Sequence, residues 1–163
     1  MSMIDRLPER PEHIGIVVAD VDRARAELLA LYGPLPGLDF PYTFTPDKVW
    51  TDGEPFEGPA ALRLCMVQWS PNMKIELLQP LYGGNWEPAR FLERTGGGIH
   101  HTAYYTKEHF DAYRQLLLDQ GAKPLFQSET EDDRGYRRCC YLKLKESGTI
   151  IEIAEPPKPF PNR

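Results

Sequence analysis

The chain has 163 residues, of which 41% are hydrophobic and 26% are charged, and its formal net charge is -5. This length and composition suit one globular domain, and the acidic balance argues against nucleic acid as a partner, because binding a phosphate backbone needs a basic surface. No apolar run approaches the roughly 18–20 residues that cross a bilayer, so we expect no membrane partner. The opening segment MSMIDRLPERPEH lacks the apolar stretch of a signal peptide, which predicts a cytoplasmic location.

The first elements in chain order are an apolar strand at 13–18 and a helix that starts at Asp20 or Asp22 and ends at Gly33. The segment 39–58 follows, and strands at 62–67 and 73–80 come after it. Segment 85–98, NWEPARFLERTGGG, predicts a short helix that ends in a glycine run. A strand at 101–105, a helix that starts near Thr106, and strands at 137–142 and 149–156 complete the chain.

The second half of the chain repeats the first. A shift of 88 residues aligns the first strand and helix, and shifts of 76 and 75 align the later strands. The pairs that match in type are His13 with His101, Ala24 with Ala112, Gly33 with Gly121, Glu76 with Glu152, and Arg63 with Arg138. The first copy is about 12 residues longer, and the excess falls in segment 39–58. The repeat predicts a single α+β domain of two βαβββ modules, at about 10–80 and 98–156, with a linker helix at about 85–95.

Strand alternation assigns the side chains of each first strand to opposite faces. His13 lies on the face opposite Ile14 and Ile16, which should pack on the helix. In the second copy, His101 shares a face with Tyr105. His100 should therefore point away from His101, and His101 rather than His100 is the predicted partner of His13.

Glu76 and Glu152 interrupt the apolar strands MKIELLQP and TIIEIAEP. An unpartnered buried carboxylate costs several kcal/mol or becomes neutral. Taken singly, each glutamate could lie on a solvated face, and each histidine could simply start a strand. Their symmetric register instead predicts one divalent metal site formed by His13, Glu76, His101 and Glu152, for Zn, Ni, Co, Mn or Fe.

The segments HIGIVVADVDRA, IELLQP, GGGIHHTAYYT and IIEIAEP resemble the vicinal oxygen chelate superfamily, which includes glyoxalases, bleomycin-resistance proteins and extradiol dioxygenases. The resemblance implies an eight-stranded cup around a metal that these same four residues hold. The succession IELLQP, PARFLERTGGGIHHTAYY and YLKLKESGTIIEI is most similar to the methylmalonyl-CoA epimerase family. Segment 39–58 departs from that family.

The resemblance implies an epimerase or isomerase that moves an α-proton through a metal-stabilised enolate and uses no organic cofactor. It also implies a small-molecule substrate, such as an acyl-CoA or other carbonyl compound, and a homodimer. The alternatives are a glyoxalase I-like lyase, a dioxygenase, and a metal-free binding protein of the bleomycin-resistance type. Candidate bases are Glu152 and Glu57, and candidate substrate contacts are Arg63, Arg138, Tyr105 and Trp50.

Three further features give weaker expectations. Tyr42, Phe44, Trp50 and Phe56 make segment 39–58 aromatic, which suggests a lid or a loop that shapes the substrate site. Cys65, Cys139 and Cys140 are odd in number, and we expect buried, reduced thiols. His109 should lie on the surface, and the proline-rich tail EPPKPFPNR should be extended and carry no site.

Overall fold

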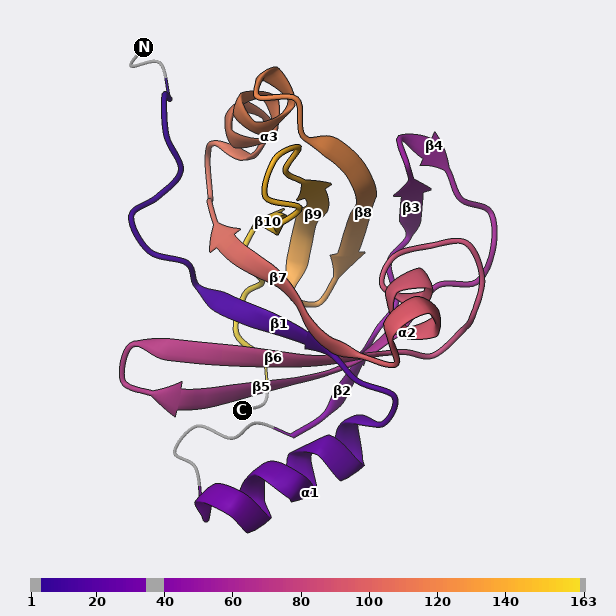
Figure 1. Ribbon diagram of the computed structural model, residues 1–163, viewed down its shortest axis with the longest axis vertical. Coiled ribbons are helices and arrows are strands. Elements are labelled where there is room, and N and C mark those ends of the chain that lie inside the picture. The colour runs from indigo at the N-terminus through magenta and orange to yellow at the C-terminus, as the bar shows by residue number, and fades with distance from the viewer. Residues whose placement is uncertain (1–3, 35–39, 162–163) are drawn as a thin grey trace.

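The computed structural model describes residues 4–34 and 40–161, which form a curled ten-stranded mixed sheet of order β2-β5-β6-β1-β7-β10-β9-β8-β3-β4 (Figure 1). The strands are β1 (His13–Val17), β2 (Tyr42–Phe44), β3 (Lys48–Thr51), β4 (Glu54–Pro55), β5 (Leu62–Ser70), β6 (Met73–Pro80), β7 (Gly98–Tyr105), β8 (Lys123–Asp132), β9 (Gly135–Lys143) and β10 (Ile150–Ala154). The helices are α1 (Val21–Tyr32), α2 (Ala89–Thr95) and α3 (Phe110–Asp119).

The sheet confirms the predicted two-module α+β fold. Module one consists of β1, α1, β2, β5 and β6, and module two consists of β7, α3, β8, β9 and β10. Strand β1 pairs in parallel with β6, as β7 does with β10, and the modules meet where β1 and β7 pair antiparallel. The order β2-β5-β6-β1 is thus repeated in reverse as β7-β10-β9-β8, which places the four central strands symmetrically about one axis.

The long segment of module one adds the two strands beyond the expected eight. Residue 39 of this segment lies outside the described residues. Strand β3 leaves module one and pairs antiparallel with β8, with Trp50 opposite Gln127, and β4 continues the sheet as the partner of β3. The side chain of Asp47 reinforces this contact by accepting a hydrogen bond from Glu131 N at 2.7 Å. Module one therefore extends the outer edge of module two (Figure 1).

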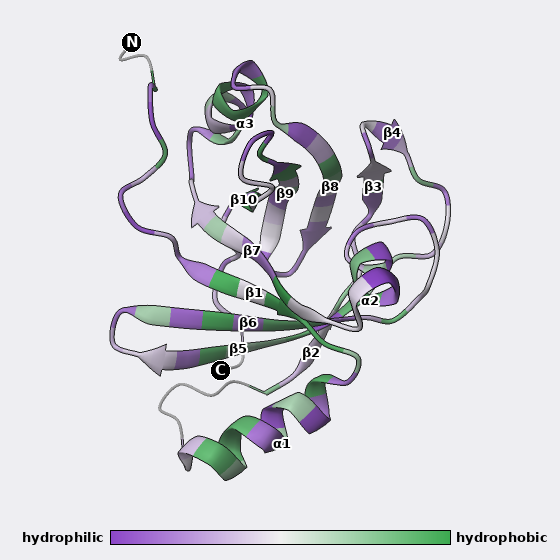
Figure 2. Cartoon of the chain, viewed as in Figure 1, coloured by the Kyte–Doolittle hydropathy of each residue, from purple (hydrophilic) through white to green (hydrophobic). Residues whose placement is uncertain are grey.

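Helices α1 and α3 lie on the outside of the sheet, one against each module (Figure 1). Asp20 caps α1 by accepting a hydrogen bond from Arg23 N at 3.0 Å, and Gly33 ends the helix with φ 72°. Figure 2 shows apolar and polar residues alternating along α1, as expected for a helix with one buried face. In the described part of the chain, the helices are too short or too polar to span a membrane.

Three apolar clusters hold these layers together. One lies under α1 around Val21 and Leu77, and a second lies under α3 around Phe110 and Ile153. The third fills part of the concave side of the sheet and includes Trp86, which is fully buried. The concave side, which we call the cup, therefore has a floor that is partly packed with apolar side chains.

Candidate metal centre

Four polar side chains from the four central strands converge inside the cup. They are those expected from the repeat, namely His13 on β1, Glu76 on β6, His101 on β7 and Glu152 on β10, and their ligand atoms all lie within 4.8 Å of one another. His13, His101 and Glu152 are buried, and the Glu76 side chain is 12% exposed. The centre is therefore open to solvent mainly on the side of Glu76.

Gly15 provides the space that this arrangement requires. It lies in β1 between Glu76 of β6 and His101 of β7 in the strand register. A Cβ atom at position 15 would lie 2.0 Å from Cε1 of His101, which is far closer than non-bonded atoms approach. The glycine of HIGIV thus lets the His101 ring lie across the strand that carries His13.

The distances between the ligand atoms suit a divalent ion. Nε2 of His13 lies 3.4 Å from Oε2 of Glu76 and 3.3 Å from Oε2 of Glu152, and the two Nε2 atoms are 3.4 Å apart. Two ligand atoms about 2.1 Å from one ion lie about 3.0 Å apart at right angles and about 3.4 Å apart at the tetrahedral angle. The mixed imidazole and carboxylate set suits Zn or another borderline divalent metal.

The buried carboxylates and imidazoles form an environment that stabilises a positive charge between them. Oε2 of Glu152 is buried and accepts no well-aligned hydrogen bond from the described residues, although it lies 2.7 Å from Nε2 of His101. Burial lowers the pKa of His13, but the carboxylates of Glu76 and Glu152 outweigh it and raise the pKa to about 10. Burial also raises the pKa of Glu152, but the imidazoles of His101 and His13 outweigh it and hold this pKa well below its usual range. The centre attracts a cation, whether proton or metal ion.

The expected orientation of His100 is wrong. The β1–β7 pairing shifts register after Gly15, which is opposite His101, so that Ile16 is opposite Ile99 and His100 is the extra residue of a β-bulge. A bulge redirects a side chain that strict alternation would place on the other face. His100 is 5% exposed, and its Nδ1 lies 2.9 Å from Nδ1 of His101.

A cavity lies beside the centre and gives it access to a ligand. It has about 640 Å³ of empty space, part of it open to solvent, and both Glu76 and Glu152 line it. Its apolar walls include Phe44, Leu62, Leu64 and Phe126, and Arg134 and Arg137 lie among its polar lining. An apolar pocket with a few convergent polar groups is the usual form of a small-molecule site.

Three other residues proposed from the sequence, Glu57, Trp50 and Tyr105, do not line this cavity. Glu57 is exposed in the loop after β4, where it and Trp50 line a separate hollow. Tyr105 packs edge-on against His13, with 5.6 Å between ring centroids, and lines another hollow on the side of Lys74. Of the segment 39–58, it is Tyr42 and Phe44 that line the cavity.

The repeated arginines attach the helices to the sheet. Arg63 on β5 forms an ion pair with Asp22 in the first turn of α1, with 3.1 Å between Nη2 and Oδ1. Arg138 on β9 likewise pairs with Asp111 in the first turn of α3 at 3.0 Å. Arg138 also lies at the rim of the cavity, but Glu155 holds its guanidinium at 2.8 Å.

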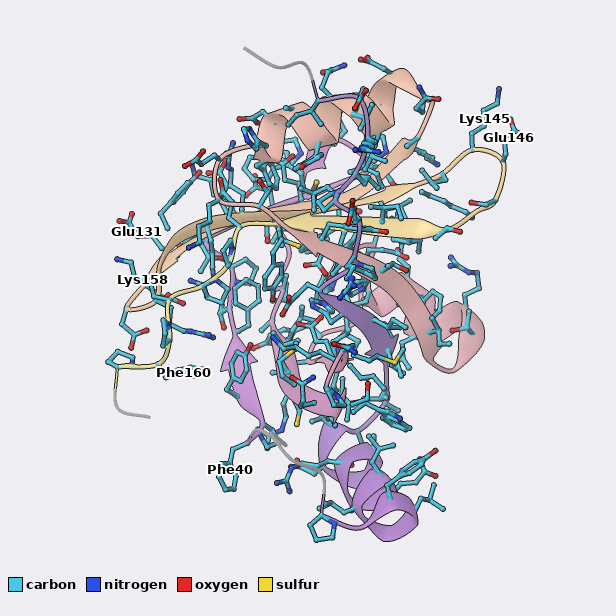
Figure 3. All side chains as sticks on the ribbon, turned by 90° about the vertical axis from the view of Figure 1, so that its left-hand side faces the viewer. Phe40, Glu131, Lys145, Glu146, Lys158 and Phe160 are labelled. Atoms are coloured by element: carbon cyan, nitrogen blue, oxygen red, sulfur yellow. The ribbon has the colours of Figure 1, made fainter. Side chains whose placement is uncertain are left out.

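Sequence reasoning missed the contributions of Cys139 and the tail. Cys65 and Cys140 are buried, whereas the Cys139 thiol donates a hydrogen bond to Oε1 of Glu152 at 3.1 Å and lines the cavity. Arg134 donates from Nε to the Lys158 carbonyl at 2.8 Å, and its guanidinium lies 3.8 Å from the ring centre of Phe160. Figure 3 shows Lys158 and Phe160 on the same side of the molecule as Glu131 of β8. The tail therefore binds the end of the β8–β9 pair near the cavity. The sequence signal for Cys139 was strand alternation, which places Cys139 and Cys140 on opposite faces of the sheet.

Comparison with known proteins agrees with this fold. The family model described as the glyoxalase/bleomycin resistance protein/dioxygenase superfamily matches residues 12–141. An ethylmalonyl-CoA/methylmalonyl-CoA epimerase from Cereibacter sphaeroides is 30% identical over 156 residues, which cover 94% of this chain and 99% of the relative. The methylmalonyl-CoA epimerase of Mycobacterium tuberculosis has a similar fold, with a TM-score of 0.56, 22% identity and 93% of each chain covered. The Streptomyces coelicolor methylmalonyl-CoA epimerase in complex with 2-nitronate-propionyl-CoA gives a TM-score of 0.57 at 21% identity, covering 90% of this chain and 96% of that one.

Proposed function

Because the chain belongs to the glyoxalase/bleomycin resistance protein/dioxygenase superfamily, we propose that it is a metal-dependent epimerase of 2-substituted acyl-CoA thioesters. The observation that carries this proposal is the convergence of two carboxylates and two imidazoles at the wall of one apolar cavity. The Cereibacter sphaeroides relative, an ethylmalonyl-CoA/methylmalonyl-CoA epimerase similar over nearly its whole length, supports the substrate class.

His13, Glu76, His101 and Glu152 would hold the ion. When bound, a divalent ion supplies Lewis-acid stabilisation of the negative charge that develops on the carbonyl oxygen of the substrate. The two glutamates face this centre through Oε2, since these are the oxygens within 3.6 Å of the histidine nitrogens. The second oxygen, Oε1, of each carboxylate is therefore the atom that we assign to proton transfer.

Epimerisation needs a proton to leave one face of C2 and another to reach the opposite face. Glu76 comes from module one and Glu152 from module two, and we assign one carboxylate to each face of a planar carbon held between them. Oε1 of one glutamate takes the α-proton, and the C2–H electron pair moves into the thioester enolate. The other glutamate, protonated at Oε1, returns a proton to C2. The Cys139 thiol orients Oε1 of Glu152 through its hydrogen bond.

The cavity walls exclude water and hold the rest of the acyl group. Phe44, Leu62 and Leu64 offer an apolar surface to a 2-alkyl substituent. Arg134 and Arg137 line the same cavity, and we assign the attraction of an anionic thioester to Arg134, because Asp132 pairs with the Arg137 guanidinium at 2.7 Å.

Loss of the α-proton signal in heavy water tests the proposal. Metal-loaded protein should exchange the C2 proton of ethylmalonyl-CoA and methylmalonyl-CoA faster than buffer alone, as ¹H NMR measures directly. Glu76→Gln and Glu152→Gln should each lower inversion by about 10²–10⁴-fold, while Glu146→Gln, at an exposed turn shown in Figure 3, should not. A loss in Glu57→Gln of the same size would instead assign the base to that residue.

Glyoxalase I chemistry also begins with loss of a proton next to a carbonyl, so proton exchange alone does not distinguish it from epimerisation. A second substrate is needed to separate the two. Turnover of a hemithioacetal of glutathione and methylglyoxal, without exchange in the acyl-CoA esters, would refute the epimerase proposal. Consumption of dioxygen with a catechol would instead indicate a dioxygenase.

A further inference from the structure

The doubled histidine of β7 is a place where the polar centre departs from its twofold symmetry. The position in module one that corresponds to His100 is Glu12, and its carboxylate pairs with Lys74 at the surface. His100 instead lies inside the cup, because the β-bulge turns it toward His101. His101 consequently has a side-chain partner that His13 lacks, and Nδ1 of His13 is buried without a hydrogen-bond partner among residues 4–34 and 40–161.

The contacts of His100 form a directed chain that leads away from the centre. Nδ1 of His100 lies 2.9 Å from Nδ1 of His101. Nε2 of His100 lies 3.5 Å from Oε1 of Glu87, which is an ion-pair distance without an aligned hydrogen bond. Oε2 of Glu87 accepts a hydrogen bond from Nε of Arg90 at 2.8 Å. Phe91 and Tyr141 pack edge-on against the His100 ring, with ring centroids at 4.7 and 5.1 Å, which fixes its plane.

One assignment of protons satisfies this chain and leaves a lone pair for an ion. Arg90 can only donate, so the Glu87 carboxylate accepts from it and favours a proton on Nε2 of His100. Nδ1 of His100 then has a lone pair and accepts from Nδ1–H of His101. A neutral imidazole with its proton on Nδ1 has its lone pair on Nε2, and Nε2 is the His101 atom that faces Glu76 and Glu152.

We propose that His100 is a positioning residue that fixes His101 as the Nδ1–H tautomer and thereby sets the affinity of the centre for its divalent ion. This inference rests on the proposed metal centre and assigns a role to a residue outside the ligand set. Partners of this kind raise metal affinity about 10–100-fold. His13 lacks such a partner. The gain in metal affinity should therefore come from the side chain at position 100 and not from the general polarity of the cup.

Two substitutions separate positioning from packing. His100→Phe keeps a ring between Phe91 and Tyr141 but removes the acceptor, whereas His100→Asn keeps an acceptor oxygen near the position of Nδ1 and loses the ring. We expect His100→Phe to weaken Zn²⁺ binding by about 10–100-fold and His100→Asn to remain within about 3-fold of the unaltered chain, as measured by competition with a chromophoric chelator. Without metal, His100→Phe should melt at a higher temperature than His100→Asn, since the smaller Asn leaves a cavity.

A ¹H–¹⁵N NMR experiment on the histidine rings of the metal-free protein gives an independent readout, because an ion on Nε2 would by itself hold the proton on Nδ1. The unaltered chain and His100→Asn should both show His101 protonated on Nδ1. Either of two results would overturn the role of His100 while leaving the metal centre intact. One is a zinc affinity of His100→Phe within 3-fold of the unaltered chain, and the other is a zinc affinity of His100→Asn as low as that of His100→Phe. Failure of the unaltered chain to bind Zn²⁺ would overturn the metal centre itself, so the two failures are distinguishable.

Discussion

Removal of the Arg90 guanidinium should destabilise the fold by about 2–4 kcal/mol, because it leaves a carboxylate buried without its counterion. Glu87 is only 2% exposed, and Arg90 donates to it from Nε at 2.8 Å. Breaking a buried ion pair costs about 3–5 kcal/mol, and an exposed pair is worth about 0.2–1 kcal/mol. The Arg90 side chain is 21% exposed, so solvent screens part of the interaction, and the expected loss of about 2–4 kcal/mol begins somewhat below the buried range.

The variant Arg90→Met keeps the length of the side chain and removes its charge. Urea unfolding of the metal-free protein, followed by circular dichroism, measures the free energy directly, and a chain of this size should also lose about 4–16 °C in melting temperature. Asp52→Asn is the matched control, because Asp52 accepts from the same guanidinium at 2.6 Å but is an exposed group, so its loss should cost at most about 1 kcal/mol.

The sign of the pH dependence follows from Glu87. Burial raises its pKa, but His100 and Arg90 outweigh burial and lower it below the usual value. A glutamate whose pKa is lower in the folded than in the unfolded chain stabilises the protein fully when the pH is above its unfolded pKa of about 4.3. This stabilisation is lost as the pH falls through the pKa of the folded state. The stability gap between the unaltered chain and Arg90→Met should therefore narrow below about pH 4.

Two results would refute this reasoning. One is a loss in Arg90→Met no larger than in Asp52→Asn, which would mean that the Glu87 carboxylate does not need its partner. The other concerns the double variant Glu87→Gln/Arg90→Met, which removes the unpaired charge and should recover part of the loss. A double variant no more stable than Arg90→Met would assign the effect to packing.

Three further predictions concern the centre and its surroundings. His13→Ala should retain less than about a tenth of the bound divalent ion after dialysis, by elemental analysis, whereas His109→Ala, at an exposed position, should keep it all. A free metal concentration of 100 times Kd should stabilise the unaltered chain by about 2.7 kcal/mol, and a melting temperature of His13→Ala that rises equally with metal would contradict the assigned ligand. Gly15→Ala should cost about 1–3 kcal/mol and impair metal binding because its Cβ meets the His101 ring. Gly83→Ala, whose Cβ meets no atom within 4 Å, is the control, and equal losses in the two variants would refute the steric argument.

The repeat in the sequence was sufficient to predict the fold and the set of converging side chains. Identical residue types at equal places in two copies remain informative without any alignment, because a pseudo-twofold axis brings equivalent strands together. The same logic applies to Arg63 and Arg138, whose acidic partners Asp22 and Asp111 occupy the first turns of the two helices. The repeat thus pairs the two arginines with equivalent acidic partners, and Arg138 also lines the cavity.

The features that the sequence did not reveal depend on departures from local regularity. Strand alternation assumes an unbroken pleat, and the β-bulge beside Gly15 reverses its prediction at His100. The pairing of β3 with β8 joins residues far apart in the chain, and nothing in segment 39–58 itself identifies β8 as its partner. The tail was assigned no site because its prolines indicate extended chain, but Pro157 lines the cavity.

Some of these departures from the repeat lie at the cavity, where a difference between its two sides has a chemical use. A strictly twofold cavity would accept one substrate in two equivalent orientations, so it could not direct a thioester to one end and the reacting carbon to the centre. The tail adds Pro157 to the cavity wall, and Cys139 binds Oε1 of Glu152 on the side of module two. His100 supports the ligand of module two only. The symmetric part of the fold thus brings the ligand atoms together, and the asymmetric additions make the two sides of the cavity different, which a single bound orientation requires.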